Sequence, residues 1–470
     1  MSGEPSQLEM STTLRRAVPA EKPTKPLIIL CDGTWCGRET GTETNIYKLA
    51  ERIWGKFQDD TAVHQVSDRV CYVEGVGLGS SLLDYVFNGI TAQDIARQCI
   101  EVYEFIVKNY TYPDHEIWMF GLSRGAYLVR AVAGMINNCG VIKPVNVDGA
   151  IDMQQTHLLC EAVYDIYRSH YPIDKPHSPQ SKLFRQSKSW PFIGDEANPR
   201  APRFIPPIKF MGLFDTVGSL GLPDFTGGMG LEWPAFYDQN ISTAVENVYH
   251  AVSLHDRLYA FQPCLVSRNE NRHKSDWENF GITRQEWLPG VHYDLGRQRF
   301  RFLREFGGGK LEKFLARWGF ASRIIEPNHV LADFALRWML LAVRAHNPQP
   351  QAAYQVVPEI DQFIRDVTDN IRDRPHQVGD GDVYGNILYY APFGSFILDI
   401  VRALRGTRWK ISAIYQLFFD LRDRFVPDQD ATVYDFRSFD PDIGESIENL
   451  GDIFEQRYPS KSYEKWELLQ

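Results

Sequence analysis

Ser123, Asp215 and His292 are the residues of this chain whose types and order could support covalent chemistry. A serine hydroxyl is a poor nucleophile at neutral pH unless a neighbouring imidazole takes its proton. The imidazole in turn needs a carboxylate that fixes its tautomer and stabilises its charged form. We therefore predict Ser123 as the nucleophile, His292 as the general base and Asp215 as the acid. Each of the three follows an apolar run that is typical of a buried strand.

The sequence around Ser123 is Gly121-Leu122-Ser123-Arg124-Gly125. Residues 116–120 before it are mostly apolar and predict a strand, and residues 126–136 after it have small and apolar side chains at helical spacing. A strand, a sharp turn and a helix around Gly-x-Ser-x-Gly form the nucleophile elbow of α/β-hydrolases, which also have the chain order serine, acid, histidine. The glycines permit the tight turn because they lack a Cβ atom. The alternative is an ordinary turn in which Ser123 caps the helix.

The base follows another apolar run. His292 comes directly after Pro289-Gly290-Val291, at the end of a predicted strand over 285–291. The alternative interpretation is a histidine that only bonds the backbone of its loop. Asp294, two residues further on, is a nearby carboxylate that we expect to brace this loop.

Two carboxylates compete for the role of the acid. Asp215 follows the continuous apolar run 209–214, which predicts a buried strand without ambiguity. Asp256 follows the run 251–254 and has the more usual position of the acid. However, residues 242–250 are predicted as a helix, and 248–261 also fit one continuous helix. We therefore favour Asp215.

The negative oxygen of a tetrahedral intermediate requires preorganised N–H donors. We expect one from the backbone of Arg124, the residue after the nucleophile. The other is expected from the loop Asp32-Gly33-Thr34-Trp35, so Gly33 and Thr34 are the candidate oxyanion residues there. The alternative is that Asp32 and Thr34 only cap the following turn.

The same loop permits a different enzyme class. A strand that ends in Asp-Gly-Thr is typical of haloacid-dehalogenase-type phosphatases, but these need another aspartate two residues earlier, where this chain has Leu30. The glycine-rich residues 75–79 lack the lysine and spacing of a phosphate-binding loop. Residues 379–382 lack the further ligands of a calcium loop. We expect no metal and no organic cofactor.

Apolar runs alternate with helical patterns along the chain, which predicts an α/β fold with a doubly wound, mostly parallel sheet of the α/β-hydrolase type. The expected strands cover 26–31, 70–73, 116–120 and 209–214, and the expected helices include 45–50, 90–109 and 330–344. We predict a disordered leader over 1–25, a catalytic domain over 26–345 with an insertion over the site at about 144–207, and a helical C-terminal extension or cap over 346–470.

Composition limits the function classes. The 470 residues have a net charge of −10 with dispersed basic residues, which excludes a nucleic-acid footprint. The seven cysteines are scattered, which indicates neither disulfides nor a zinc site and favours the cytoplasm. No uncharged apolar run approaches the ~18–20 residues that cross a bilayer. Peripheral contact with a membrane is left open, and the sequence predicts no oligomeric state.

Taken together, these motifs resemble the α/β-hydrolase domain family that contains the phospholipase effectors of bacterial type VI secretion and many uncharacterised fungal members. The resemblance covers about residues 26–345 in the right order. It implies Ser123 as nucleophile, His292 as base and an aspartate such as Asp215 as acid, in the hydrolysis of carboxylic esters of lipids. The segments that carry it are 31–35, 44–49, 72–77, 120–127, 212–218, 289–292 and 335–339.

The chain departs from this family at two places. Members continue the histidine motif with a run of three glycines, whereas residues 294–299 here read Asp-Leu-Gly-Arg-Gln-Arg, and a basic, aromatic insertion follows to about Lys310. Where relatives have Leu-Asp-Glu, this chain has Leu254-His255-Asp256, which supports Asp215 as the acid. We therefore predict a serine hydrolase acting on lipid or phospholipid esters. The alternatives are an esterase for a small secondary metabolite and a binding protein that keeps the hydrolase fold without turnover.

Overall fold

A computed structural model gives the structure of the chain. The structure describes residues 24–33, 41–55, 67–75, 92–176, 178–191, 206–217, 241, 244–258, 261–267, 283–299, 324–349, 351–374, 376–383, 421–427, 431–434 and 457–470.

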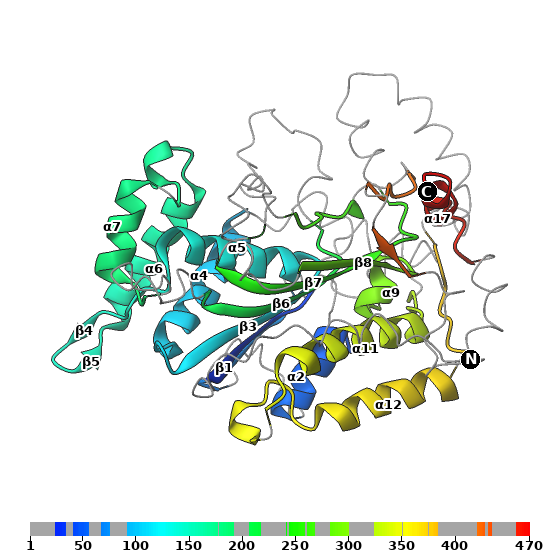
Figure 1. Cartoon of the computed structure of the whole chain (residues 1–470), viewed down its shortest axis with the longest axis horizontal. Coiled ribbons are helices and arrows are strands. Elements are labelled where there is room, and N and C mark those ends of the chain that lie inside the picture. The colour runs from blue at the N-terminus through cyan, green and yellow to red at the C-terminus, as the bar shows by residue number, and fades with distance from the viewer. Residues whose placement is uncertain are drawn as a thin grey trace, which may run out of the picture.

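Seven described strands form one sheet in the order β2-β1-β3-β6-β7-β8-β9 (Figure 1). Every neighbouring pair in this sheet is parallel, which confirms the predicted α/β class with a mostly parallel sheet. The strands are β1 (Lys25–Cys31), β2 (Val70–Val73), β3 (His115–Leu122), β6 (Ile208–Phe214), β7 (Val245–Ser253), β8 (Thr283–Leu288) and β9 (Thr432–Val433).

Helices cover both faces of the sheet, which is why its strands are apolar on both sides (Figure 1). Along β1, Leu27 and Ile29 belong to one apolar core, and Ile28 and Leu30 belong to the other. One face carries α4 (Ala92–Asn109), α5 (Arg124–Cys139) and α6 (Met153–Arg168), and the other carries α2 (Asn45–Trp54), α11 (His329–His346) and α12 (Ile360–Asp373).

The segment before Asp256 differs from the predicted helix over 242–250. Residues 245–253 form the strand β7, which pairs with β6 and β8 on its two sides. The polar side chains of β7 resemble the pattern of an amphipathic helix, but they bond neighbouring strands. Asn247 donates to the carbonyl oxygen of Lys209 in β6, and the His250 ring bonds Gln285 in β8. Asp256 therefore does follow a strand, in the loop next to that of Asp215.

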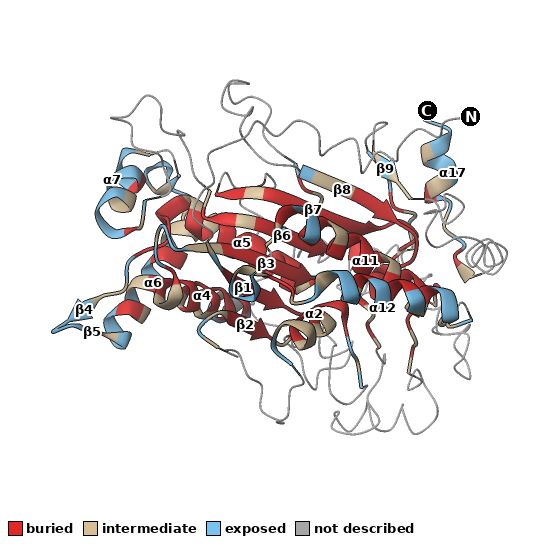
Figure 2. Cartoon of the chain, turned by 60° about the horizontal axis from the view of Figure 1, so that its bottom comes forward, coloured by how far each residue is buried: buried red, intermediate tan, exposed pale blue. Residues whose placement is uncertain are grey.

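The described part of the predicted insertion consists of the hairpin β4 (Asn146–Val147) and β5 (Ala150–Ile151), then α6, the 3₁₀ turn η2 (Pro172–Asp174) and α7 (Pro179–Lys188). Figure 2 shows the hairpin and α7 as largely exposed. Arg185 Nη1 donates to the carbonyl oxygen of Asn138 at 2.6 Å, near the C-terminal end of α5. Ser123 precedes the other end of α5. The helix α7 therefore lies at the end of α5 opposite to Ser123, and the position of the rest of the insertion stays a prediction.

Residues beyond the predicted boundary at 345 contribute to the same sheet. They include the 3₁₀ turn η5 (Ala352–Tyr354), α12, the strand β9 and the helix α17 (Ser462–Glu467). β9 pairs in parallel with β8, so part of the predicted C-terminal extension continues the main sheet. Among the elements described there, α12, α17 and η5 are helical and β9 is a strand, in agreement with the predicted helical character. The domain boundary itself stays a prediction.

Candidate active site

Ser123 lies in the turn between β3 and α5, with φ of 56° and ψ of −117°. A positive φ is uncommon for a residue with a Cβ atom, and such strain is frequent at functional sites. Within the described residues, the Ser123 hydroxyl does not cap α5. It lies 2.8 Å from His292 Nε2 instead. The alternative interpretation of Ser123 as a helix cap is therefore wrong.

The two glycines of the motif are needed because other backbone approaches them closely. A Cβ atom on Gly121 would lie 2.5 Å from the Cα atom of Ala126. A Cβ atom on Gly125 would lie 2.6 Å from the carbonyl oxygen of Asp32. The end of β1 and the start of α5 therefore pack backbone against backbone, which any larger side chain would prevent.

The structure brings the three sequence-predicted residues into one hydrogen-bonded series. His292 is the first residue of α9 (His292–Gly296), and its Nε2 lies 2.8 Å from Ser123 Oγ. Its Nδ1 lies 2.6 Å from Asp215 Oδ2. All three residues are buried. When Nδ1–H donates to Asp215, Nε2 is left to accept the Ser123 proton, which is the tautomer that a general base requires.

Asp215 follows β6 in a strained turn with φ of 40°. Its backbone N–H donates to Ala251 of β7 at 2.7 Å, and the N–H of Thr216 donates to His250 Nε2 at 3.1 Å. Its carboxylate accepts from the backbone N–H of Ser253 at 2.9 Å and from the Ser253 hydroxyl at 3.0 Å. Neighbouring parallel strands thus hold the carboxylate toward His292.

Arg424 also binds this carboxylate. Its Nη1 lies 2.6 Å from Asp215 Oδ1, and its Nη2 lies 2.9 Å from Oδ2. Burial alone raises the pKa of Asp215, but the charges and hydrogen bonds of Arg424 and His292 outweigh it and hold the pKa well below its usual range. Sequence reasoning missed Arg424 because the segment 421–425, Leu-Arg-Asp-Arg-Phe, has no motif that distinguishes one arginine from the other.

Asp256 and Asp294 bond the backbone around His292. The backbone N–H of His292 donates to Asp256 Oδ2 at 2.9 Å, and Leu258 N–H donates to Oδ1 at 2.9 Å. Asp294 accepts from Val291 N–H at 3.0 Å and from Asn328 N–H at 2.7 Å, in agreement with a bracing role. Burial raises the pKa of each of the two carboxyls to about 6.

The three candidate oxyanion residues have different surroundings. The backbone N–H of Gly33 donates to its neighbour Asp32 Oδ1 at 2.8 Å. Thr44 and Tyr72 donate their hydroxyls to Asp32 Oδ2 at 2.7 and 2.8 Å, so Asp32 organises this loop. Arg124 begins α5, and a backbone N–H in the first turn of a helix has no acceptor within the helix. Thr34 lies outside the described residues.

The unusual sequence after His292 is paired with neighbouring elements. Arg297 has φ of 56°, and its Nη1 lies 2.7 Å from Asp333 of α11. Arg299 Nε lies 2.7 Å from Glu326 Oε2. The Gln298 side chain lies against Gly33, where a Cβ atom would be 2.5 Å from Gln298 Nε2. These basic residues therefore connect α9 to its neighbours, and the rest of the predicted insertion, residues 300–310, lies outside the described residues.

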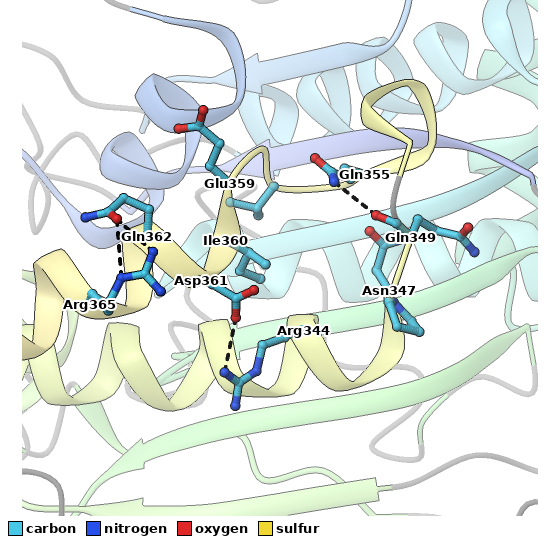
Figure 3. A pocket seen from close by; sticks show the side chains of 11 residues that line it. Arg344, Asn347, Gln349, Gln355, Glu359, Ile360, Asp361, Gln362 and Arg365 are labelled. Atoms are coloured by element: carbon cyan, nitrogen blue, oxygen red, sulfur yellow. Dashed lines mark hydrogen bonds and ion pairs between the residues drawn. The ribbon is translucent and has the colours of Figure 1, made fainter.

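A cleft of about 700 Å³ lies elsewhere, between the C-terminal end of α11 and the start of α12 (Figure 3). Its lining is mostly polar, and Arg344 pairs with Asp361 at 3.2 Å. The start of α11 is the end near His292, since Asn328 before it bonds Asp294. The 18 residues of α11 span about 27 Å, so the cleft is remote from Ser123.

In the described ranges, no three His, Cys, Asp or Glu side chains are grouped as a metal ion would require. The six described cysteines are free and buried. Of the helices that the structure describes, none combines the length and apolar character needed to cross a membrane.

The mostly parallel sheet, with helices on both faces and the elbow at Ser123, is an α/β-hydrolase-like fold. The catalytic-domain model of the Tle1-like phospholipase effectors of type VI secretion matches residues 25–342. The match covers well over half of the chain, so the chain belongs to this family. The resemblance inferred from the sequence is thereby confirmed.

Individual relatives are more distant. The uncharacterised protein YEL023C of Saccharomyces cerevisiae is 29% identical over 252 residues, which are 50% of this chain and 32% of that protein. The chain thus spans about a third of that relative's length. A structure of the Tle1 effector bound to the VgrG spike of the type VI secretion system has 16% identity and a TM-score of 0.26, over 63% of this chain and 55% of that one. An uncharacterised protein of Pseudomonas aeruginosa has 16% identity and a TM-score of 0.30, over 92% and 64%.

Proposed function

We propose that this protein is a serine hydrolase that cleaves carboxylic esters through an acyl-enzyme intermediate. The observation that carries the proposal is the position of the His292 ring, with Nε2 2.8 Å from Ser123 Oγ and Nδ1 2.6 Å from Asp215 Oδ2. Both distances are within the reach that proton transfer and tautomer control require. A buried serine in a strained elbow is also the arrangement that presents a nucleophile at the end of a parallel sheet.

In the first half of the reaction, His292 Nε2 takes the proton of the Ser123 hydroxyl while Oγ attacks the ester carbonyl carbon. The carbonyl oxygen becomes negative, and we assign its N–H donors to Arg124 and to the loop that contains Gly33 and Thr34. Gly33 remains a candidate, although its N–H already donates to Asp32 Oδ1 at 2.8 Å. Asp215 stabilises the charged imidazole during this step.

The intermediate then collapses. The C–O bond to the leaving group breaks, and protonated His292 donates its proton to the departing oxygen, so an alcohol is released and the acyl group stays on Ser123 Oγ. In the second half, His292 takes a proton from water, the resulting hydroxide attacks the acyl carbon, and the proton returns to Ser123 as the carboxylic acid is released. No cofactor enters this sequence.

We assign the substrate to lipid esters, and phospholipids first among them. The support for this class is membership of a phospholipase effector family, whose model covers the elbow, Asp215 and His292. We also propose a cytoplasmic location, because thiols that are free and buried, as the six described cysteines are, suit a reducing compartment.

Labelling with a fluorophosphonate probe tests the nucleophile without knowledge of the substrate. Wild-type protein is expected to form one adduct on Ser123, and Ser123→Ala is expected to form none. Ser187→Ala is the matched control, because Ser187 is an exposed serine on α7. An equal adduct in Ser123→Ala, or none in the wild type, would exclude the proposal. Hydrolysis of esters of graded acyl length and of phospholipid vesicles then defines the substrate.

A further inference from the structure

We propose that Arg424 is a positioning residue of this active site, which holds Asp215 and the Phe261 backbone so that the His292 ring stays aligned with Ser123. The inference rests on the proposed function, since it assigns a role relative to the same nucleophile and base. Arg424 lies outside residues 25–342, the range that the family model matches. The C-terminal part of the chain thereby supplies a side chain to the centre of the site.

Arg424 and Asp215 form a bidentate ion pair. Nη1 donates to Oδ1 at 2.6 Å and Nη2 donates to Oδ2 at 2.9 Å, and the exposed fractions of the two side chains are 1% and 0%. A guanidinium fixes the plane of a carboxylate because its donors are rigid, whereas a lysine ammonium would hold it only as a point charge. This orientation determines where Oδ2 meets His292 Nδ1.

Arg424 also organises the residues around the carboxylate. Its Nη1 donates to the carbonyl oxygen of Ser253 at 2.7 Å and to the Ser253 hydroxyl at 2.5 Å. That hydroxyl donates in turn to Asp215 Oδ2 at 3.0 Å. The end of β7 and the acid are therefore tied together through one guanidinium.

The same guanidinium also bonds the backbone of a residue whose ring packs on the histidine. Arg424 Nη2 donates to the carbonyl oxygen of Phe261, and the Phe261 ring stacks on His292 with centroids 4.6 Å apart and an interplanar angle of 28°. His292 is thus held at Nδ1 by Asp215 and across its ring by Phe261. Arg424 bonds both of these residues.

The Arg424 guanidinium distinguishes Asp215 from the two other buried aspartates near His292. Asp215, Asp256 and Asp294 are all completely buried. Burial raises the pKa of Asp256 and of Asp294 to about 6, whereas the pKa of Asp215, which is bonded by Arg424, is held below its usual range. An ionised carboxylate only accepts hydrogen bonds, so Asp215 keeps the His292 Nδ1–H as its donor.

The test compares Arg424→Gln and Arg424→Lys with the wild type in two assays, the rate of fluorophosphonate labelling at Ser123 and the hydrolysis of p-nitrophenyl butyrate. We expect a loss of about 100-fold in labelling rate and kcat for Arg424→Gln, with little change in KM, because a small misplacement of the base has effects of this size. The acidic limb of its pH profile should move to higher pH, since the pKa of Asp215 rises when Arg424 no longer offsets burial. Arg424→Lys should lower the rate but shift the limb less.

Arg422→Gln is the control, because it makes the same change at an exposed position two residues away and should label at the wild-type rate. A folded Arg424→Gln protein with wild-type labelling rate and pH profile would overturn the inference and leave the proposed function intact. Absence of labelling in the wild type would instead reject the proposed function.

The double variant Asp215→Asn/Arg424→Gln keeps the inference testable if the single change prevents folding, because it removes both buried charges together. In the Asp215→Asn background, loss of Arg424 should cost far less than about 100-fold in labelling rate, since of the two residues that it holds only Phe261 is unchanged. A further loss of about 100-fold in that background would show that Arg424 acts by another route.

Discussion

The loops after β6 and β7 have equivalent positions in the fold. Each follows a parallel strand of the same sheet, and each presents a buried aspartate that bonds His292. Asp215 bonds the ring at Nδ1, whereas Asp256 bonds the backbone N–H of the same residue. Arg424 binds the Asp215 carboxylate in a fork, and the pKa values of the two carboxyls are displaced in opposite directions.

Position in the sheet does not by itself distinguish the acid. Both aspartates occupy strand ends, which is where an α/β fold gathers its functional side chains. The two carboxylates differ in their partners. Asp215 is bonded so that it remains charged beside an imidazole, whereas Asp256 accepts two backbone N–H groups and holds α9 in place. Four changes would break or sharpen this contrast.

The largest effect is expected for Asp215→Asn. The amide no longer carries the charge that stabilises the imidazolium, and it favours the wrong tautomer of His292, so kcat should fall on the order of 10⁴-fold. The measurement is the rate at which Asp215→Asn and Asp256→Asn each hydrolyse p-nitrophenyl butyrate. The kcat of Asp256→Asn should fall by no more than about tenfold, because Asp256 contacts the backbone of His292. A larger loss in Asp256→Asn than in Asp215→Asn would reverse the assignment.

Asp256→Ala should act on stability more than on chemistry. It leaves the buried N–H groups of His292 and Leu258 without their acceptor, which destabilises a folded protein by about 1–3 kcal/mol for each such group. Denaturant unfolding followed by circular dichroism measures the free energy of unfolding. A variant as stable as the wild type would contradict the bracing role.

Asp215 and Asp256 should contribute with opposite signs to the pH dependence of the free energy of unfolding. The pKa of Asp256 is raised from 3.8 to about 6 in the folded protein, so the folded state binds more protons between these values and the free energy of unfolding falls as pH rises through them. Asp215, with its lowered pKa, contributes stability above about pH 4 that is lost as pH falls further. Denaturant unfolding at pH 4.5 and pH 7 should show a decrease on the order of 2 kcal/mol from Asp256. Asp256→Asn should reduce this decrease, and an unchanged difference between the two pH values would refute the prediction.

The smallest effect is expected for Ser253→Ala. The change removes one hydroxyl that donates to Asp215 Oδ2 at 3.0 Å, while the Ser253 backbone N–H still donates to Oδ1 at 2.9 Å. One such hydrogen bond contributes about 1 kcal/mol, so kcat should fall about fivefold. Steady-state kinetics on the same ester measures it, and a loss as large as that of Asp215→Asn would mean that the hydroxyl does more than hold the carboxylate.

Much of the fold and part of the candidate site could be predicted from the sequence alone. Strands such as β1, β3 and β6 are continuous apolar runs because helices cover both faces of a parallel sheet, and that pattern is visible without coordinates. Ser123, Asp215 and His292 were indicated for the same reason, since each follows such a run. The strand β7 was not predicted over its full length because its buried Asn and His side chains give the segment a pattern that resembles a helix.

The rest was decided by tertiary structure. The choice between Asp215 and Asp256 depends on which carboxylate reaches the ring of His292, and the sequence at the end of a strand does not encode that distance. Arg424 is 209 residues from Asp215 along the chain, and its segment carries no local signal. A hydrogen bond between such distant residues exists only once the chain has packed. The sequence by itself therefore determined which residues could do the chemistry. The packing of the strands determined which of them lie together, and the packing of the C-terminal part added Arg424.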